Sequence, residues 1–136
     1  WSADVCSSDL YGAINDFERR MMDEGIRVVK VMLHISKDEQ YARLEERLER
    51  PDKYWKYDPV DVDERMVWDE YQGAYQVMLE RTSTDVAPWF VVPANAKWYA
   101  RLAAQELLLA AMESIDPQWP EADFDVEAEL KRLKSS

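Results

Sequence analysis

The stretch Ser36–Pro59, which reads SKDEQYARLEERLERPDKYWKYDP, decides how the chain is organised. Ser36 followed three residues later by Glu39 is a capping box, which predicts that a helix begins here. A residue that precedes a proline avoids helical backbone angles, so Pro51 predicts that the helix ends at Arg50. The stretch therefore divides into a helix and a following loop.

The basic residues of this stretch gather on one side of it. At about 100° per residue, Arg43, Arg47 and Arg50 form a stripe along the border of an apolar face. We expect that face, Tyr41, Leu44 and Leu48, to point to the core, and the side with Glu45, Glu46 and Glu49 to be solvated. The loop adds Lys53 and Lys56 on either side of Trp55. The pattern suits a lid that grips a polyanion; the alternative is an ordinary solvated helix with weak Glu–Arg pairs.

Composition limits the classes of function. The 136 residues are enough for one domain, and 47% of them are hydrophobic. The formal net charge of −11 argues against binding to nucleic acid or to an anionic membrane, so an anionic ligand needs a local basic site. No apolar run is long enough to span a bilayer. The single cysteine, Cys6, excludes an internal disulfide and fits a cytoplasmic protein.

The two ends of the chain differ from its middle. Residues 1–10, WSADVCSSDL, show no periodicity and none of the features of a signal peptide, and they match a translated sequencing adapter. We expect them to be a non-native leader; a genuine disordered leader is the alternative. Residues 11–120 form the expected folded domain, with the lid at 36–59, and residues 121–136 form an acidic helical tail.

Between these ends, helical and strand patterns alternate. Residues 28–35 and 89–92 are apolar and rich in β-branched residues, as strands of a buried parallel sheet are. Helices are expected at residues 14–24, 59–81, 96–115 and 124–133. This order predicts an α/β layered fold with a parallel sheet. Two strands do not complete such a sheet, so we expect the natural N-terminal part to be missing.

Several single residues also received an interpretation. His34 is expected to be an ordinary strand residue, because no second histidine exists. The aromatic residues of 59–81 are expected to face the core, and Asn95 to cap the helix at 96–115. Lys97 and Trp98 open that helix just past the end of a strand, where α/β folds bind ligands.

Five segments together resemble one family. INDFER, LHISKDEQ, RLEERLERPDKYWKY, TSTDVAPWFVVPA and KWY are similar, in this order, to the second family of polyphosphate kinases, over Ile14–Pro120. The resemblance implies a P-loop kinase fold of three layers, similar to thymidylate kinase. It also implies transfer of a phosphoryl group between inorganic polyphosphate and a nucleoside mono- or diphosphate, with Mg²⁺, in a homo-oligomer.

The resemblance assigns roles within the lid. Arg43 and Arg47 match the arginines of the lid helix that face phosphate and act in catalysis. Residues of the lid loop and its border match positions that bind substrate: Arg50, Lys53, Trp55 and Lys56. Lys97 and Trp98 are expected on the nucleotide side.

The family's phosphate-binding and metal-binding motifs are absent from the chain. It contains neither the Walker A loop, GxDxxGKG, nor the Walker B segment, DRSWY, and its three glycines lie elsewhere. We therefore expect only the C-terminal half of the enzyme, inactive alone, with the Mg²⁺ ligands outside the chain. The alternatives are a non-catalytic α/β protein that binds a partner, and part of a nucleoside monophosphate kinase that uses ATP. The acceptor nucleotide stays open.

Overall fold

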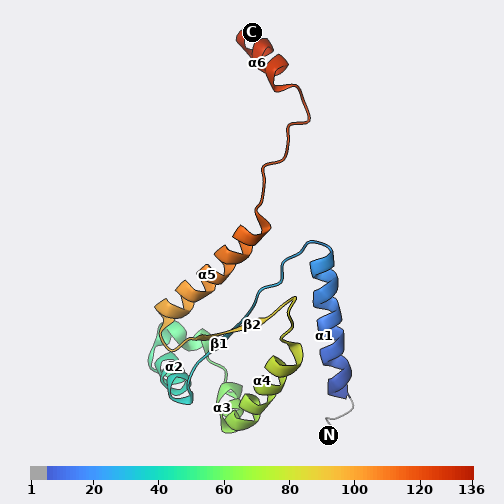
Figure 1. Cartoon of the computed structure of the whole chain (residues 1–136). Helices are drawn as coiled ribbons and strands as arrows, with labels where there is room; N and C mark the ends of the chain where they lie inside the picture. Colours follow the sequence, from blue (N-terminus) through green and yellow to red (C-terminus); the bar gives the residue numbers. More distant parts are fainter. Residues whose placement is uncertain (1–5) are drawn as a thin grey trace.

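The computed structural model describes residues 6–136, with side chains from Leu10 onward. Its elements follow one another along the chain as Figure 1 shows. They are α1 (Cys6–Asp23), β1 (Lys30–His34), α2 (Lys37–Glu49), the 3₁₀ helix η1 (Pro51–Lys56), α3 (Val60–Met66), α4 (Trp68–Thr82), β2 (Trp89–Pro93), α5 (Lys97–Ile115) and α6 (Val126–Lys134). Within this part of the chain, no helix is long and apolar enough to cross a membrane.

The two strands form a parallel pair, which confirms the predicted α/β class. Lys30 lies opposite Trp89, and His34 lies opposite Pro93. Beyond the strands, the Ala94 N–H donates to the His34 carbonyl at 2.7 Å. Helices α1 and α4 contact the side chains on one face of the sheet, and α5 packs on the other. The sheet is thus the middle of three layers.

The apolar core lies between the sheet and α5. Buried Val92, Ala94 and Ala100 form its centre, and partly buried side chains of β1 and α5 surround it. The expectation that the first strand is buried on both faces is wrong, because Leu33 is 57% exposed. The aromatic stripe of α4 is not core either, since Tyr71 and Tyr75 stay open to solvent. Both face the side of β1 on which the described residues provide no further strand.

A buried polar cluster joins α1, β1 and the end of α4. The Lys30 ammonium donates to Glu18 Oε2 at 2.7 Å and to the Thr82 carbonyl, and it lies 5.4 Å from the centre of the Trp89 ring. Trp89 Nε1 in turn donates to Thr82 Oγ1 at 2.9 Å. Lys30 and Glu18 are each only 8% exposed. The cluster therefore fixes α1 and the α4–β2 turn to the start of the sheet.

The helix predicted over residues 59–81 is in fact two helices. Val67 leaves helical geometry, with φ −101° and ψ 31°, so α3 ends and α4 begins there. The Val67 N–H donates to the Glu64 carbonyl at 3.2 Å, the tighter bond that often closes a last turn. The side chain of Asp58 supports the start of α3, where it accepts from the Val60 N–H at 3.0 Å.

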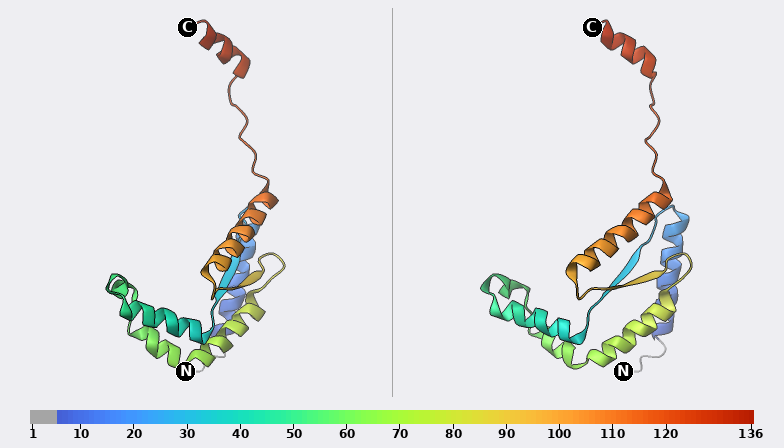
Figure 2. Two further views of the ribbon diagram at one scale, coloured as in Figure 1. Left: turned by 90° about the vertical axis from the view of Figure 1, so that its left-hand side faces the viewer. Right: turned by 60° about the vertical axis from the view of Figure 1, so that its left-hand side comes forward.

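The N-terminal end of the described chain departs from expectation, whereas the helix expected over residues 124–133 is present as α6 (Val126–Lys134). Helix α1 begins at Cys6 rather than Ile14, so Cys6–Leu10 of the expected leader is helical, while residues 1–5 lie outside the described part. Their non-native origin stays a prediction. At the other end, residues 117–125 form no helix or strand, and α6 stands well away from the sheet (Figures 1 and 2).

Candidate functional site

The site lies where both strands end and α2 begins. Ser36 caps α2 as predicted, since its Oγ accepts from the Glu39 N–H at 3.1 Å. Asn95, which follows β2, braces this cap: its Oδ1 accepts from the Ser36 N–H at 2.9 Å, and its Nδ2 donates to Ser36 Oγ at 3.1 Å. The prediction that Asn95 caps α5 is therefore wrong: the N-cap residue of α5 is Ala96, which provides no side-chain cap.

This brace makes the stability of α2 depend on a residue far away in sequence. A Ser36→Ala variant should lose about 1 kcal/mol of the free energy of unfolding, because the cap is lost. Asn95→Ala should lose a similar amount, although it lies outside α2, because it leaves Ser36 with fewer partners. Denaturant unfolding followed by circular dichroism measures both. Wild-type stability in Asn95→Ala would contradict the bracing role.

Arg43, a predicted catalytic residue, is engaged within the protein. Its Nε donates to Glu39 at 2.7 Å, and its Nη2 donates to the carbonyls of Ala94 at 2.7 Å and Asn95 at 3.3 Å. Its side chain is only 26% exposed. Arg43 thus joins α2 to the turn between β2 and α5, which is a bracing contact as well as a cation at the end of the sheet.

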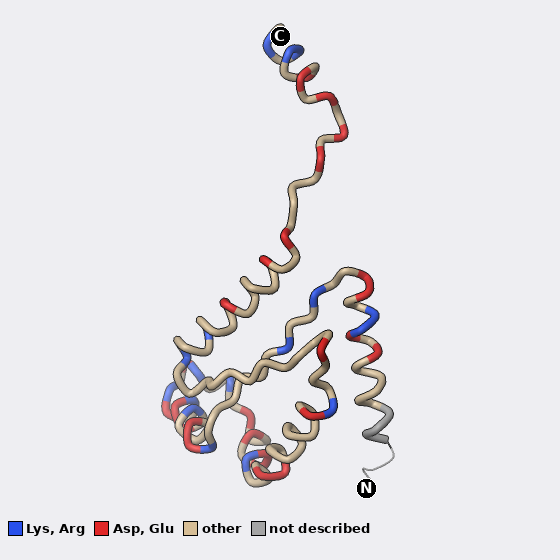
Figure 3. The backbone as a smooth tube through the Cα atoms, viewed as in Figure 1, with Lys and Arg blue, Asp and Glu red and all other residues tan. Residues whose placement is uncertain are grey.

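The other predicted cations form what we call the cationic arm, which consists of Arg47, Arg50, Lys53 and Lys56. These residues belong to α2 and η1, along which basic and acidic residues alternate (Figure 3). Three of the four are paired with carboxylates. Arg47 lies 3.2 Å from Asp61, Arg50 lies 2.8 Å from Asp52 and 3.4 Å from Glu46, and Lys53 also pairs with Glu46.

Lys56 has no carboxylate within ion-pair distance among the described residues, and it lies over Trp55 instead. Its Nζ is 4.6 Å from the centre of the indole ring, which is a cation–π contact. The ring is oriented by a hydrogen bond from Nε1 to the Asp52 carbonyl at 3.0 Å. Because Trp55 is 78% exposed, the pair presents an open positive charge at the tip of the arm.

Two carboxylates that pair with the arm, Glu46 and Asp52, are held in the ionised form by their partners. The hydrogen bond from Lys53 lowers the pKa of Glu46, and the hydrogen bond from Arg50 lowers the pKa of Asp52. In return, Asp52 raises the pKa of Arg50. The pairs lie at the surface, where such contacts stabilise the fold little. Breaking one of these pairs therefore costs little stability.

The apolar face of α2 is narrower than predicted. Leu44 is buried as expected, but Tyr41 and Leu48 are exposed, so two of the three core assignments are wrong. Tyr41 donates instead to Glu45 at 2.9 Å, and this hydrogen bond raises its pKa. Only the middle of α2 thus packs inward.

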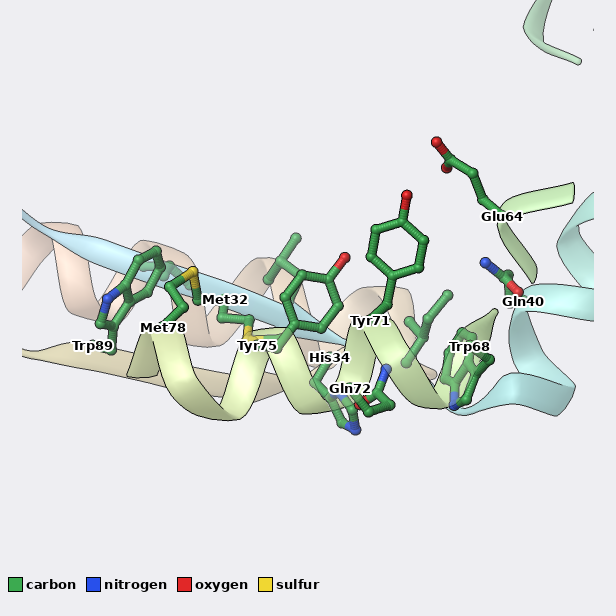
Figure 4. Close-up of a pocket in the computed structure, with 13 residues that line it drawn as sticks. Met32, His34, Gln40, Glu64, Trp68, Tyr71, Gln72, Tyr75, Met78 and Trp89 are labelled. Carbon is green, nitrogen blue, oxygen red and sulfur yellow. The ribbon is translucent and has the colours of Figure 1, made fainter. Parts of the chain in front are cut away.

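A cavity that was not predicted from the sequence lies between β1 and α4. It is a cavity of about 380 Å³, in which Tyr71, Tyr75 and Met78 follow one another along α4 beside β1 (Figure 4). The rings of Tyr71 and Tyr75 are 6.1 Å apart, and the negative charge of Glu64 raises the pKa of Tyr71. His34 also lines this cavity. The aromatic spacing was the available signal, but it was assigned to the core.

The side chains of residues 10–136 do not suit a magnesium site. Among the side chains of residues 10–136, no group of three or more His, Cys, Asp or Glu lies close enough together to hold a metal ion. Three carboxylates beside the cationic arm, Glu46, Asp52 and Asp61, are each paired with a lysine or arginine of the arm.

Comparison with known proteins identifies the family. The sequence model described as polyphosphate kinase 2 matches residues 2–120. The chain belongs to the polyphosphate kinase 2 family. It is 44% identical, over 113 residues, to an AMP/ADP-polyphosphate phosphotransferase from Meiothermus ruber, which aligns 83% of this chain with 42% of that protein.

Solved structures of polyphosphate kinase 2 agree with the fold. The crystal structure from Arthrobacter aurescens TC1 matches 98% of this chain and 48% of its own, with 54% identity and a TM-score of 0.92. The crystal structure of a putative polyphosphate kinase 2 from Pseudomonas aeruginosa matches 87% of this chain and 25% of its own chain, with 38% identity and a TM-score of 0.80. The chain spans less than half the length of each. The predicted P-loop kinase type of α/β fold is confirmed by these structures.

Membership of the polyphosphate kinase 2 family confirms the resemblance seen in the sequence. The structure brings Arg47, Arg50, Lys53 and Lys56 together on one arm. It places Lys97 with Arg43 beside a separate cavity at the start of α5. Trp98 is 69% exposed and packs edge-on against Tyr99, away from the lining of that cavity. The roles of these side chains stay predictions.

Proposed function

We propose that this chain is the lid-bearing part of a cytoplasmic polyphosphate phosphotransferase. The enzyme moves a phosphoryl group between inorganic polyphosphate and a nucleoside mono- or diphosphate. The observation that carries the proposal is the cationic arm at the carboxyl ends of the strands, within a chain whose net charge is −11. Relatives named as AMP/ADP- and GDP-polyphosphate phosphotransferases support the same substrates.

The arm can bind a polyanion by exchanging partners. Phosphate oxygens take the places of Asp61, Asp52 and Glu46, and the planar guanidinium groups of Arg47 and Arg50 each meet two oxygens at once. Positioning and charge neutralisation supply most of the catalysis in phosphoryl transfer. An arm that closes over the polyanion also excludes water, which would otherwise accept the phosphoryl group. The family resemblance also implies Mg²⁺, which would be held by residues other than those described here and would supply further positive charge for the phosphate oxygens.

The proposal is tested by restoring the part of the fold that the relatives possess. The chain is joined to the N-terminal segment of the Arthrobacter aurescens enzyme, with which it shares 54% identity. We expect the fused protein to phosphorylate AMP or ADP with polyphosphate as donor, and the 136-residue chain alone to be inactive. A fused, folded protein that uses ATP but ignores polyphosphate would instead support a nucleoside monophosphate kinase. One that uses neither donor would contradict the proposal.

The two lysines of the arm should affect binding more than chemistry. In the fused protein, Lys53→Ala and Lys56→Ala should raise KM for polyphosphate several-fold and leave kcat nearly unchanged, because a flexible ammonium acts as a point charge. The KM of each variant should also depend less on salt concentration, since fewer screened contacts remain. Steady-state kinetics at two ionic strengths measures both effects. A fall in kcat with unchanged KM would contradict a binding role.

We also propose that the working enzyme is a homo-oligomer. Support comes from apolar side chains that α5 and α6 leave exposed. They are Leu102, Leu108, Leu109, Met112 and Ile115 on α5, and Val126, Leu130 and Leu133 on α6. Such patches mark interaction surfaces in soluble proteins. Light scattering of the fused protein tests this, and a monomer at micromolar concentration would exclude it.

A further inference from the structure

A cavity of about 230 Å³ opens at the start of α5, on the face of the sheet opposite α4. Its floor is apolar and is made of Leu33 and the small side chains Ala94, Ala100 and Ala104. Three cations surround that floor: Arg43 from α2, and Lys97 and Arg101 from α5. The alanines leave space that larger side chains would fill. The cavity is therefore a hollow with positive charges at its border.

The two cations from α5 stand close together without an anion. Lys97 and Arg101 are one helical turn apart, a spacing at which like charges repel and destabilise a helix. Among the described residues, neither has a carboxylate within ion-pair distance, whereas three of the four residues of the cationic arm are paired. The charge of Lys97 helps to lower the pKa of Glu46, although Lys53, which bonds Glu46, lowers it more. This local excess of positive charge stands out in an acidic chain.

The backbone at the cavity adds donors of the same sign. Helix α5 begins without a side-chain cap, because Asn95 is used by Ser36. The first N–H groups of a helix have no partner within the helix and carry the positive end of its dipole. This end of α5 therefore adds to the positive potential next to the cavity.

Arg43 differs from its two neighbours in this cavity. Its guanidinium already donates to Glu39 and to the carbonyls of Ala94 and Asn95, so it holds the wall of the cavity in place. It is a positioning residue here. Lys97 and Arg101 are the groups free to meet a ligand.

We propose that this cavity is a second phosphoryl-binding site, in which Lys97 and Arg101 hold a phosphate group apart from the cationic arm. The inference rests on the proposed function, which supplies two sources of that chemistry: the end of a polyphosphate chain, or the phosphates of the nucleotide. The phosphate group would lie at the open rim of the cavity, where Lys97 and Arg101 stand, since contact with the apolar floor would cost it hydration. Arg101 is a site residue that the motifs of the sequence did not indicate.

The test measures binding, so it is independent of catalysis. Tripolyphosphate and ADP are titrated separately into the 136-residue chain, and backbone amide shifts are recorded by NMR. We expect either ligand, or both, to shift the amides of residues 97–101. In a Lys97→Gln/Arg101→Gln double variant, the binding that moves these amides should weaken about tenfold or more, because two charge-assisted contacts are lost. Both residues are exposed, so the variant should keep the wild-type circular dichroism spectrum.

The matched control is Lys131→Gln/Arg132→Gln, which removes the same charge from α6. It should bind both ligands as the wild type does. Loss of tripolyphosphate binding in the cavity variant assigns the site to polyphosphate, and loss of ADP binding assigns it to the nucleotide. The inference is overturned if neither ligand shifts residues 97–101, or if both double variants lose affinity equally. Activity of the fused protein with polyphosphate would in that case still uphold the proposed function.

Discussion

Lys30→Met is expected to lower the free energy of unfolding by about 3–5 kcal/mol, the cost of breaking a buried ion pair by removing one partner. The variant leaves the Glu18 carboxylate at 8% exposure with its cation gone, and it leaves the Thr82 carbonyl without its donor. It also removes the cation from the Trp89 ring. Denaturant unfolding of the chain, followed by circular dichroism, measures the change.

A double variant separates the charge effect from packing. Lys30→Met/Glu18→Leu removes both charges, so it should recover a large part of the lost stability. Lys131→Met, at an exposed position of α6, is the control and should change stability by less than about 0.5 kcal/mol. If Lys30→Met were as stable as the control, the buried cluster would not hold α1 against the sheet.

In the fused protein, Arg47→Ala is expected to lower kcat and kcat/KM together by about a hundredfold or more, as the loss of a transition-state arginine does. Arg47 bonds only Asp61 in this structure, at 3.2 Å, and both side chains are 35% exposed. Its removal therefore leaves no buried group without a partner, and stability should hardly change. Steady-state kinetics and thermal unfolding of the same preparation measure the two properties.

Arg43→Ala and Glu45→Ala bracket this result. Arg43→Ala should lose stability as well as activity, because it also releases the carbonyls of Ala94 and Asn95. Glu45→Ala, whose partner is the exposed Tyr41, should change neither property much. Wild-type kinetics in Arg47→Ala, together with reduced activity in Glu45→Ala, would show that the wrong face of α2 was assigned to phosphate.

Local signals in the sequence predicted the elements well. The capping box at Ser36 and the proline at 51 placed the ends of α2, and β-branched composition found both strands. These signals act over a few residues, so they are readable without the fold. The break at Val67 was missed because a single residue with non-helical angles leaves no strong mark in an otherwise helical pattern.

Contacts between distant segments were beyond the sequence. Lys30 looked like one polar residue in an apolar strand, and only the fold brings it to Glu18 and Thr82. Asn95 had two possible helices to cap, and the parallel strands place it against the earlier one. The cations of the arm were found from spacing, but Asp61, which neutralises Arg47, belongs to the next helix.

The internal pairing of the cationic arm decides how dissolved ions act on the enzyme. A polyanion that meets free protein cations releases the small cations condensed around it, and the released number sets how steeply affinity falls with salt. In the binding mode proposed above, polyphosphate would also set free Glu46, Asp52 and Asp61, which would then attract small cations of their own. Release of small cations from polyphosphate and their uptake by the freed carboxylates oppose each other. The net number of small cations released is therefore smaller than the number of phosphate contacts. Affinity for polyphosphate should therefore tolerate changes in ionic strength better than the number of lysines and arginines alone suggests.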